Sequence, residues 1–312
     1  MSKKDSTVVN FSQYSSILRE EVVTIHTLLS YFKKTDMDYD RNGNILINFN
    51  KDTAGSPILV AHLDNVLSGE REPVMDLSAS TIFGKKNGIG FDDKAGIIGI
   101  IEIWRRSKDK QFRIIFTSDE EVGGVGALAL DKRYYEDAAY IIELDRRGNN
   151  DLINVSGTTR LCSEEFADMF AAYGFKRATG TFTDVNIFKE NAPKVNMVNL
   201  SIGYYNAHTD NEYLNVRDFQ YIVDCVADFI ETNRDCIPDE TPIDNRVNPL
   251  SKEPYATMFQ DRFSGFDDQP QCDWCGKNVR EEDAIYDGDQ IFCCKHCWET
   301  AYFYDEEMKE LN

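Results

Sequence analysis

Histidine, aspartate and glutamate residues occur in small groups that follow apolar runs through the first 210 residues of the chain. Imidazole and carboxylate groups are ligands of catalytic zinc, and two zinc ions that share a water also need one further carboxylate to move protons. One such group alone is weak support for a metal site, but five in a fixed order predict a di-zinc centre. The groups are His62-Leu63-Asp64, Asp92-Asp93-Lys94, Asp119-Glu120-Glu121, Glu143-Leu144-Asp145 and His208.

The spacing of His62 and Asp64 suits a metal-bound histidine and its partner. Residues i and i+2 of an extended chain point to the same side. Asp64 can therefore hydrogen-bond the imidazole of His62 and fix its tautomer, as carboxylates commonly do beside metal sites. Taken alone, this pair would equally fit an ordinary polar strand end.

Asp92 and Asp93 follow the glycine-containing segment 88–91 and precede a helical pattern. Acidic residues are favoured at helix N-termini, where they cap the helix and meet its dipole. Capping explains one of the two aspartates but not both. A carboxylate can bridge two metals through its two oxygens, and we assign that role to Asp92.

Glu120 and Glu121 form a tandem acidic pair that ends an apolar run and precedes Val122-Gly123-Gly124. Acidic pairs usually belong to solvated surfaces, but this position makes a solvated face a poorer explanation. Neighbouring residues of an extended chain point to different sides. One glutamate can then bind metal while the other takes a proton from water.

The candidate groups lie at the ends of predicted strands. Strands are predicted at 57–61, 112–117, 139–142 and 195–200, and helices at 16–33, 94–106, 124–130, 164–173 and 217–232. Uninterrupted apolar runs suit strands that are covered on both faces, and their alternation with helices predicts an α/β fold with a largely parallel mixed sheet flanked by helices. Ligand sites in such sheets lie beyond the carboxyl ends of the strands, where these groups fall.

Taken together, the motifs resemble the catalytic domain of the di-zinc exopeptidase clan, which includes peptidase T, carboxypeptidase G and the bacterial leucyl aminopeptidases. The segment 90–96 is similar to the one that carries the clan's bridging aspartate, and 119–121 resembles its base-then-ligand pair. Thr183-Asp184 and the segment 203–208 resemble its late aspartate loop and final histidine. The resemblance covers roughly residues 15–232.

The resemblance also implies a role for each candidate. His62 and Asp145 would bind one zinc ion, and Glu121 and His208 would bind the other. Asp92 would bridge the two ions, and Glu120 would be the general base. The implied activity is hydrolysis of peptide bonds in small peptides.

One departure concerns the lid domain of peptidase T and carboxypeptidase G, which lies before the final histidine. Only 62 residues, 146–207, separate Asp145 from His208, which leaves no room for a lid of ordinary domain size. The layout is therefore closer to the lidless aminopeptidases, and we expect an aminopeptidase. The alternatives are an N-acyl amino acid amidohydrolase and a non-catalytic binding protein on a peptidase fold. Arg146 and Arg147 are a further departure, either a solvated turn or a cationic pair that meets a substrate carboxylate.

Composition limits the classes of partner. The formal net charge of −20 argues against binding to nucleic acid or to an anionic membrane, and no apolar run approaches the length of a membrane span. The N-terminus lacks the apolar core of a signal peptide, so we expect a cytoplasmic protein. We expect the catalytic domain at 1–232 and a proline-rich linker or strap at 233–270.

The remaining residues, 271–312, predict a small zinc-binding module. Two Cys-x-x-Cys pairs separated by 18 residues fit a structural zinc ion, which would be the third in the chain. Cys293 and His296 allow another register, but we prefer the all-cysteine set. The segment 285–294 resembles small treble-clef-like fingers with a hairpin before the second cysteine pair. Such fingers serve folding or contact with a protein partner. The preferred ligands are Cys272, Cys275, Cys294 and Cys297.

Overall fold

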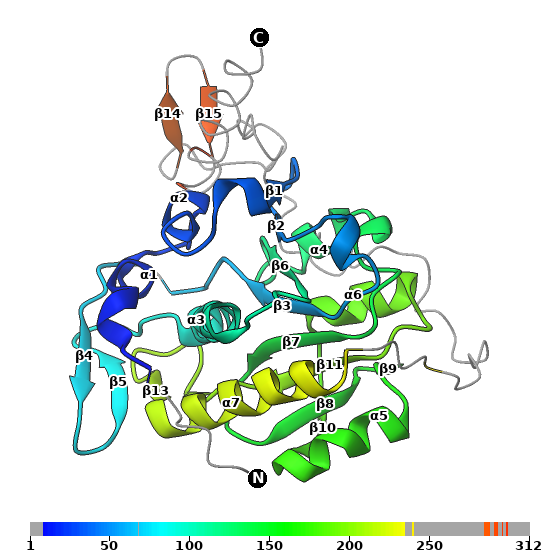
Figure 1. Ribbon diagram of the computed structural model, residues 1–312. Helices are drawn as coiled ribbons and strands as arrows, with labels where there is room; N and C mark the ends of the chain where they lie inside the picture. Colours follow the sequence, from blue (N-terminus) through cyan, green and yellow to red (C-terminus); the bar gives the residue numbers. More distant parts are fainter. Residues whose placement is uncertain are drawn as a thin grey trace.

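The computed structural model describes residues 9–67, 69–234 and 239, together with 284–287, 290–292, 295 and 298. A nine-stranded sheet forms its centre, in the order β1-β2-β6-β3-β7-β11-β8-β10, with β9 paired to β8 (Figure 1). The strands are β1 (Met37–Tyr39), β2 (Ile45–Ile47), β3 (Ile58–His62), β6 (Arg113–Thr117), β7 (Ile141–Arg146), β8 (Asp151–Ser156), β9 (Thr159–Arg160), β10 (Lys176–Gly180) and β11 (Met197–Ser201).

The central strands β6, β3, β7 and β11 pair in parallel, and β10 is parallel to β8. The pairs β1–β2, β2–β6, β11–β8 and β8–β9 are antiparallel. Every residue of β3, β6 and β11 is buried, as expected for apolar strands covered on both faces. The predicted mixed, largely parallel sheet is therefore confirmed, and its four central parallel strands, β6, β3, β7 and β11, end at one edge.

Helices cover both faces of this sheet. One apolar core contains side chains of α1, α2, α3, α5 and α7, and a second, on the opposite face, contains side chains of α4 and α6 (Figure 1). The α7 helix carries a strongly apolar stripe that includes Phe219, Val226 and Phe229. The helices are α1 (Ser15–Arg19), α2 (Ile25–Leu28), α3 (Phe91–Arg106), α4 (Val125–Ala129), α5 (Glu164–Met169), α6 (Asp184–Asn191) and α7 (Val216–Thr232), and five short 3-10 turns lie at 11–14, 34–36, 51–53, 132–134 and 170–173.

The single helix predicted at 16–33 is wrong, because α1 and α2 are separated by an extended segment. The β-branched residues Val22, Val23 and Thr24 favour extended backbone there. Val23 donates its backbone N–H to the carbonyl of Leu63 at 3.2 Å, and the Thr24 side chain caps the start of α2. This contact places the N-terminal segment directly beside the residue that follows His62.

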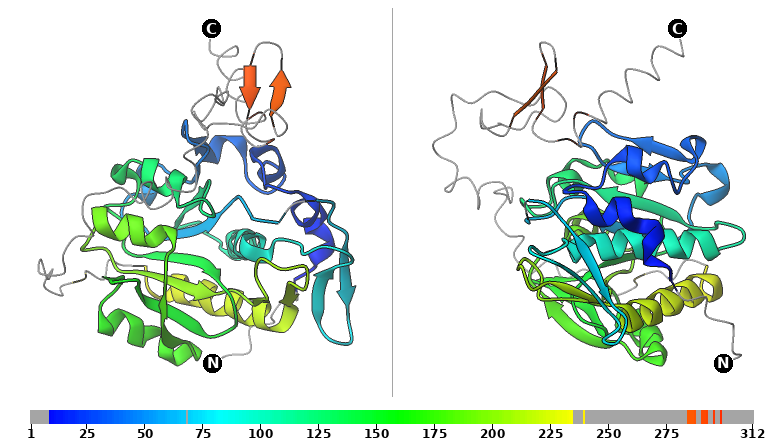
Figure 2. Two further views of the ribbon diagram at one scale, coloured as in Figure 1. Left: turned by 180° about the vertical axis from the view of Figure 1, so that it is seen from behind. Right: turned by 90° about the vertical axis from the view of Figure 1, so that its left-hand side faces the viewer.

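A second, four-stranded antiparallel sheet lies next to the central one, and the sequence did not predict it. Its order is β12-β13-β5-β4, and the β4–β5 hairpin extends from the edge of the molecule (Figures 1 and 2). The loop between its first two strands carries His208. The strands are β4 (Pro73–Asp76), β5 (Thr81–Gly84), β12 (Tyr204–Tyr205) and β13 (Tyr213–Asn215).

Only parts of the chain after α7 are described. Asp239 is buried, and its carboxylate lies 2.9 Å from both the Lys189 ammonium and the Arg160 guanidinium, so this point of the 233–270 segment is attached to the domain. The strands β14 (Ile285–Asp287) and β15 (Gln290–Phe292) form an antiparallel hairpin. Cys272, Cys275, Cys294 and Cys297 lie outside the described residues, so their zinc site stays a prediction. No helix in the described ranges is long and apolar enough to cross a membrane.

Candidate metal centre

The fold brings the predicted ligands together at the carboxyl edge of the parallel strands. His62 ends β3, Asp145 lies near the end of β7, and Glu121 is in the loop after β6. Asp92 lies in the first turn of α3, where its backbone and that of Asp93 are not helical. His208 comes from the β12–β13 loop, so five separate segments contribute to one cluster.

His62 is almost fully buried, and its two ring nitrogens face different partners. Its Nδ1 lies 2.9 Å from the backbone oxygen of Asp64, which suits an Nδ1–H donor. Its Nε2 lies 3.1 Å from Asp92 Oδ1 and 3.5 Å from Asp145 Oδ1. In that tautomer the Nε2 lone pair points at two carboxylates, an arrangement that a cation between them would stabilise.

The Asp64 carboxylate lies beside the His62 imidazole, as expected, but it does not make the shortest contact with the ring. It lies 3.4 Å from His62 Nδ1, while the shorter contact uses the Asp64 backbone oxygen. The carboxylate oxygens instead accept the backbone N–H groups of Glu120 and Glu121 at 3.0 and 3.1 Å. Asp64 therefore attaches the loop with the tandem glutamates to the end of β3.

His208 completes the other side of the cluster. Its Nε2 lies 3.0 Å from Asp92 Oδ2 and 2.9 Å from Glu121 Oε1. Asp92 thus faces His62 with one oxygen and His208 with the other. This is the arrangement that a carboxylate shared between two metal ions requires.

Asp93 lies beneath the cluster and orients it. Its buried carboxylate accepts the backbone N–H groups of His62 at 3.2 Å and of Gly96 at 2.9 Å. Gly96 is needed here because an added Cβ would lie 2.1 Å from the Leu144 carbonyl oxygen and 2.4 Å from Asp93 Oδ1. The close approach of α3 to β7 therefore positions both Asp93 and the strand that carries Asp145.

The charges of the cluster favour a bound cation. Burial and the charge of Asp92 raise the pKa of Asp145 to about 7, and burial raises the pKa of Glu120 well above its usual range. Hydrogen bonds with Asp92 and Glu121 raise the pKa of His208 to about 10. All three raised pKa values mean that this part of the protein favours bound protons or a positive charge.

The donor set also fits zinc. Ligand atoms of His62, Asp92 and Glu121 lie within 4.8 Å of one another, and so do those of His62, Asp93 and Asp145. Imidazole nitrogen and carboxylate oxygen are the donors of catalytic zinc sites. Because Asp93 is hydrogen-bonded to backbone N–H groups, Asp145 is the better ligand of the second set.

Several residues that support the cluster were missed by the sequence analysis. The Tyr204 hydroxyl donates to the backbone oxygen of Asp145 at 3.2 Å, and Asn199 accepts the Asp145 backbone N–H at 3.1 Å. Glu143, buried in β7, accepts from the Thr183 hydroxyl. Glu212, completely buried, contacts the segment before Asp92. Thr183, Glu143 and Tyr204 stood in quoted motifs but were given no supporting role there, and Asn199 and Glu212 stood in none.

The two arginines after Asp145 behave differently. Arg146 forms an ion pair with Asp151 at 3.1 Å. Arg147 is exposed and contributes with Tyr205 and Asn206 to the lining of a hollow of about 360 Å³. Of the two alternatives, a cationic pair directed at a substrate is the less favoured, because Arg146 is already paired with Asp151 and only Arg147 is exposed.

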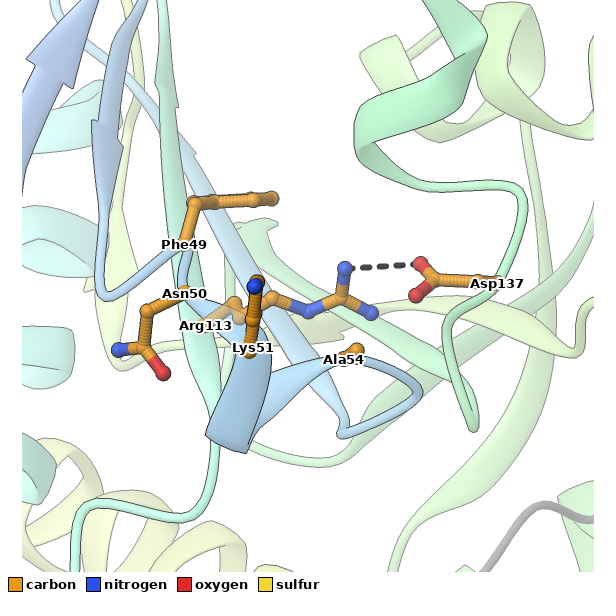
Figure 3. Close-up of a pocket in the computed structure, with 6 residues that line it drawn as sticks. All are labelled: Phe49, Asn50, Lys51, Ala54, Arg113 and Asp137. Atoms are coloured by element: carbon orange, nitrogen blue, oxygen red, sulfur yellow. Dashed lines mark hydrogen bonds and ion pairs between the residues drawn. The ribbon is translucent and has the colours of Figure 1, made fainter.

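A second hollow, of about 390 Å³, lies away from the ligands at the amino end of β6. Figure 3 shows Arg113 directed toward Asp137, with Phe49, Lys51 and Ala54 around it. The Arg113 guanidinium is 2.8 Å from the Asp137 carboxylate and also donates to the Ser56 carbonyl. Its charge is thus neutralised within the protein, and we assign the hollow no ligand.

Comparisons with solved structures agree with the fold. The aminopeptidase PepT of Bacillus cereus aligns with a TM-score of 0.57 and 17% identity, over 72% of this chain and 99% of that chain. A tripeptidase of Staphylococcus aureus aligns with a TM-score of 0.58 and 13% identity, over 72% of this chain and 99% of that chain. The TET1 peptidase of Pyrococcus horikoshii aligns with a TM-score of 0.54 and 16% identity, over 70% of this chain and 98% of that chain. At these identities the likeness is one of fold.

Sequence comparison is more specific. A search of curated proteins finds no significant match. The model of peptidase family M20/M25/M40 matches residues 58–232, more than half of the chain. The matched region contains every member of the cluster from His62 to His208. With this match, the shared fold and a cluster suited to the metal on which the family depends, the chain belongs to peptidase family M20/M25/M40.

Proposed function

We propose that the protein is a zinc-dependent aminopeptidase that acts on small peptides. The observation that carries this proposal is the position of Asp92, whose two carboxylate oxygens each face one histidine. His62 and Asp145 would hold one zinc ion, and Glu121 and His208 the other, with Asp92 between them. Each ion would then have one imidazole and two carboxylate ligands, a set typical of catalytic zinc.

Zinc ions held there would polarise the scissile carbonyl and lower the pKa of the attacking water. Glu120 is suited to handle the proton. It adjoins the proposed ligand Glu121, and the bond from its backbone N–H to Asp64 fixes its place in the loop. Burial raises the pKa of its carboxyl group, which favours a group that accepts a proton from water and then passes it to the leaving amine.

The absence of a lid between Asp145 and His208 supports action at free N-termini. Residues 147–205 are used for β8, β9, β10, β11 and β12 with the helices between them, so the described chain builds sheet where lidded relatives insert a domain. Two of the structures with this fold are an aminopeptidase and a tripeptidase. An N-acyl amino acid amidohydrolase would use the same cluster, and only the substrate's N-terminus separates the two.

The test is hydrolysis of matched peptides by the zinc-loaded protein. Dipeptides and tripeptides with a free amino group are compared with the same peptides acetylated at the N-terminus. We expect turnover of the free series and none of the acetylated series. Faster cleavage of the acetylated series would replace the aminopeptidase with an amidohydrolase, and hydrolysis of neither series would refute the proposal.

A further inference from the structure

Glu212 connects two segments that each carry a proposed metal ligand. Its side chain is completely buried and accepts three backbone N–H groups, from Gly90 at 2.6 Å, Phe91 at 2.8 Å and Asp92 at 3.2 Å. These groups lie at the start of α3, where a helix leaves N–H groups without intrahelical partners. The capping residue of α3, Gly90, supplies no side-chain acceptor, so Glu212 serves as a cap although it lies 122 residues further along the chain.

The other end of Glu212 belongs to the His208 turn. Its backbone N–H donates to the Thr209 carbonyl at 3.1 Å, which closes the turn that begins beside His208. Packing on this side is tight, because a Cβ added to Gly88 would lie 2.6 Å from the Thr209 oxygen and 3.4 Å from Glu212 Cβ. A movement of Glu212 would therefore displace both the Asp92 backbone and the His208 turn.

The other proposed ligands are held by separate contacts. His62 is the last residue of β3 and is fixed by Asp64 and Asp93. Asp145 lies in β7 and is fixed by Asn199 and Tyr204. None of these contacts involves Glu212, so the His62–Asp145 side of the cluster is positioned independently.

We propose that Glu212 is a positioning residue that sets the separation of Asp92 and His208 and thereby the affinity of the metal position formed by Asp92, Glu121 and His208. This inference rests on the proposed function for the presence of two metal positions. Glu212 holds the segments that carry Asp92 and His208, which are two of the three ligands of this metal position. The other metal position has only Asp92 on a segment held by Glu212, so its affinity depends less on Glu212. A glutamate is required because a carboxylate is purely an acceptor, whereas glutamine would place donors against a backbone N–H.

The experiment uses calorimetry to measure the stepwise binding of zinc to the metal-free full chain. Glu212→Gln should weaken one of the two steps of the pair by roughly 10- to 100-fold, the usual cost of losing a partner that orients a metal ligand. The other step should change several-fold less. Glu212→Asp keeps the charge but shortens the reach, and it should give an intermediate loss, which provides a second variant should the glutamine variant fold poorly.

Glu102→Gln is the matched control. Glu102 is a buried glutamate of α3 whose partners include Gln13, Tyr14, Arg105 and Arg106, far along the helix from Asp92. It should lower thermal stability and leave both binding steps unchanged. Equal weakening of both steps in the Glu212 variants, or unchanged binding by folded variants, would overturn the inference while the metal pair remained. A wild-type chain that binds no zinc at this cluster would refute the proposed function itself.

Discussion

Replacement of Glu120 by glutamine separates the proton-transfer role from metal binding. Glutamine has the same size and shape but cannot accept a proton at neutral pH. The contact between this residue and Asp64 uses the Glu120 backbone N–H, so the loop should keep its position. His62 and His208 contact other carboxylates, and Glu121 rather than Glu120 lies 2.9 Å from His208. Glu120→Gln should therefore leave the ligand cluster intact.

We expect the turnover number of Glu120→Gln to fall roughly 10²- to 10⁴-fold, the usual contribution of a positioned general base. This loss corresponds to about 3–5 kcal/mol of transition-state free energy. The assay combines peptide hydrolysis at saturating substrate with the zinc content of the purified variant. Glu121→Gln is the control from the same loop, and it should lose metal as well as activity. Loss of one zinc ion from Glu120→Gln, together with an intact and active Glu121→Gln, would show that the two roles are reversed.

Three further outcomes are expected. Burial raises the pKa of Asp184 to about 7. In the metal-free protein its contribution to stability is therefore present below about pH 4 and is lost as the pH rises to 7. Asp184→Asn should flatten this decline of melting temperature with pH, and an unchanged dependence of melting temperature on pH would contradict the prediction. Gly96→Ala should lower the free energy of unfolding by about 1–3 kcal/mol through the clash with Leu144. Gly99→Ala, whose Cβ would meet nothing closer than 3.2 Å, should lower it less. Denaturant unfolding measures both losses, and equal losses would argue against the close packing at Gly96. Removal of residues 271–312 should lower the zinc content by one ion, and an unchanged content would exclude the predicted module.

The sequence predicted the parts of the fold that depend on local patterns. The apolar runs located β3, β6, β7 and β11 to within two residues at their starts, because central parallel strands are buried on both faces and are therefore mostly apolar. The strand β10, largely exposed and rich in polar residues, has no such signal at the edge of the sheet. The small sheet was missed for a related reason, since its strands are two to four residues long.

The site was predictable where chemistry and spacing coincide. His62, Glu121 and Asp145 come together because parallel strands deliver the residues at their ends to one edge, and the start of α3 and the β12–β13 loop bring Asp92 and His208 to the same place. The partners that position these residues were not predictable, because their contacts cross long stretches of chain. Glu212 is an example: nothing in its local sequence indicates that it caps α3. Asp64 is a second example. Its backbone oxygen makes a shorter contact with His62 than its carboxylate does, and this difference depends on the tertiary structure.

The most direct test of the central claim, a pair of zinc ions shared by Asp92, is stepwise reconstitution of the metal-free chain. Peptide hydrolysis and bound zinc are measured together for the wild type and for Asp92→Asn. The wild type should be inactive without metal and gain activity as the pair fills, while Asp92→Asn should hold at least one zinc ion fewer and stay inactive. Full hydrolysis by the metal-free wild type, or an Asp92→Asn variant with unchanged zinc content and activity, would contradict the account.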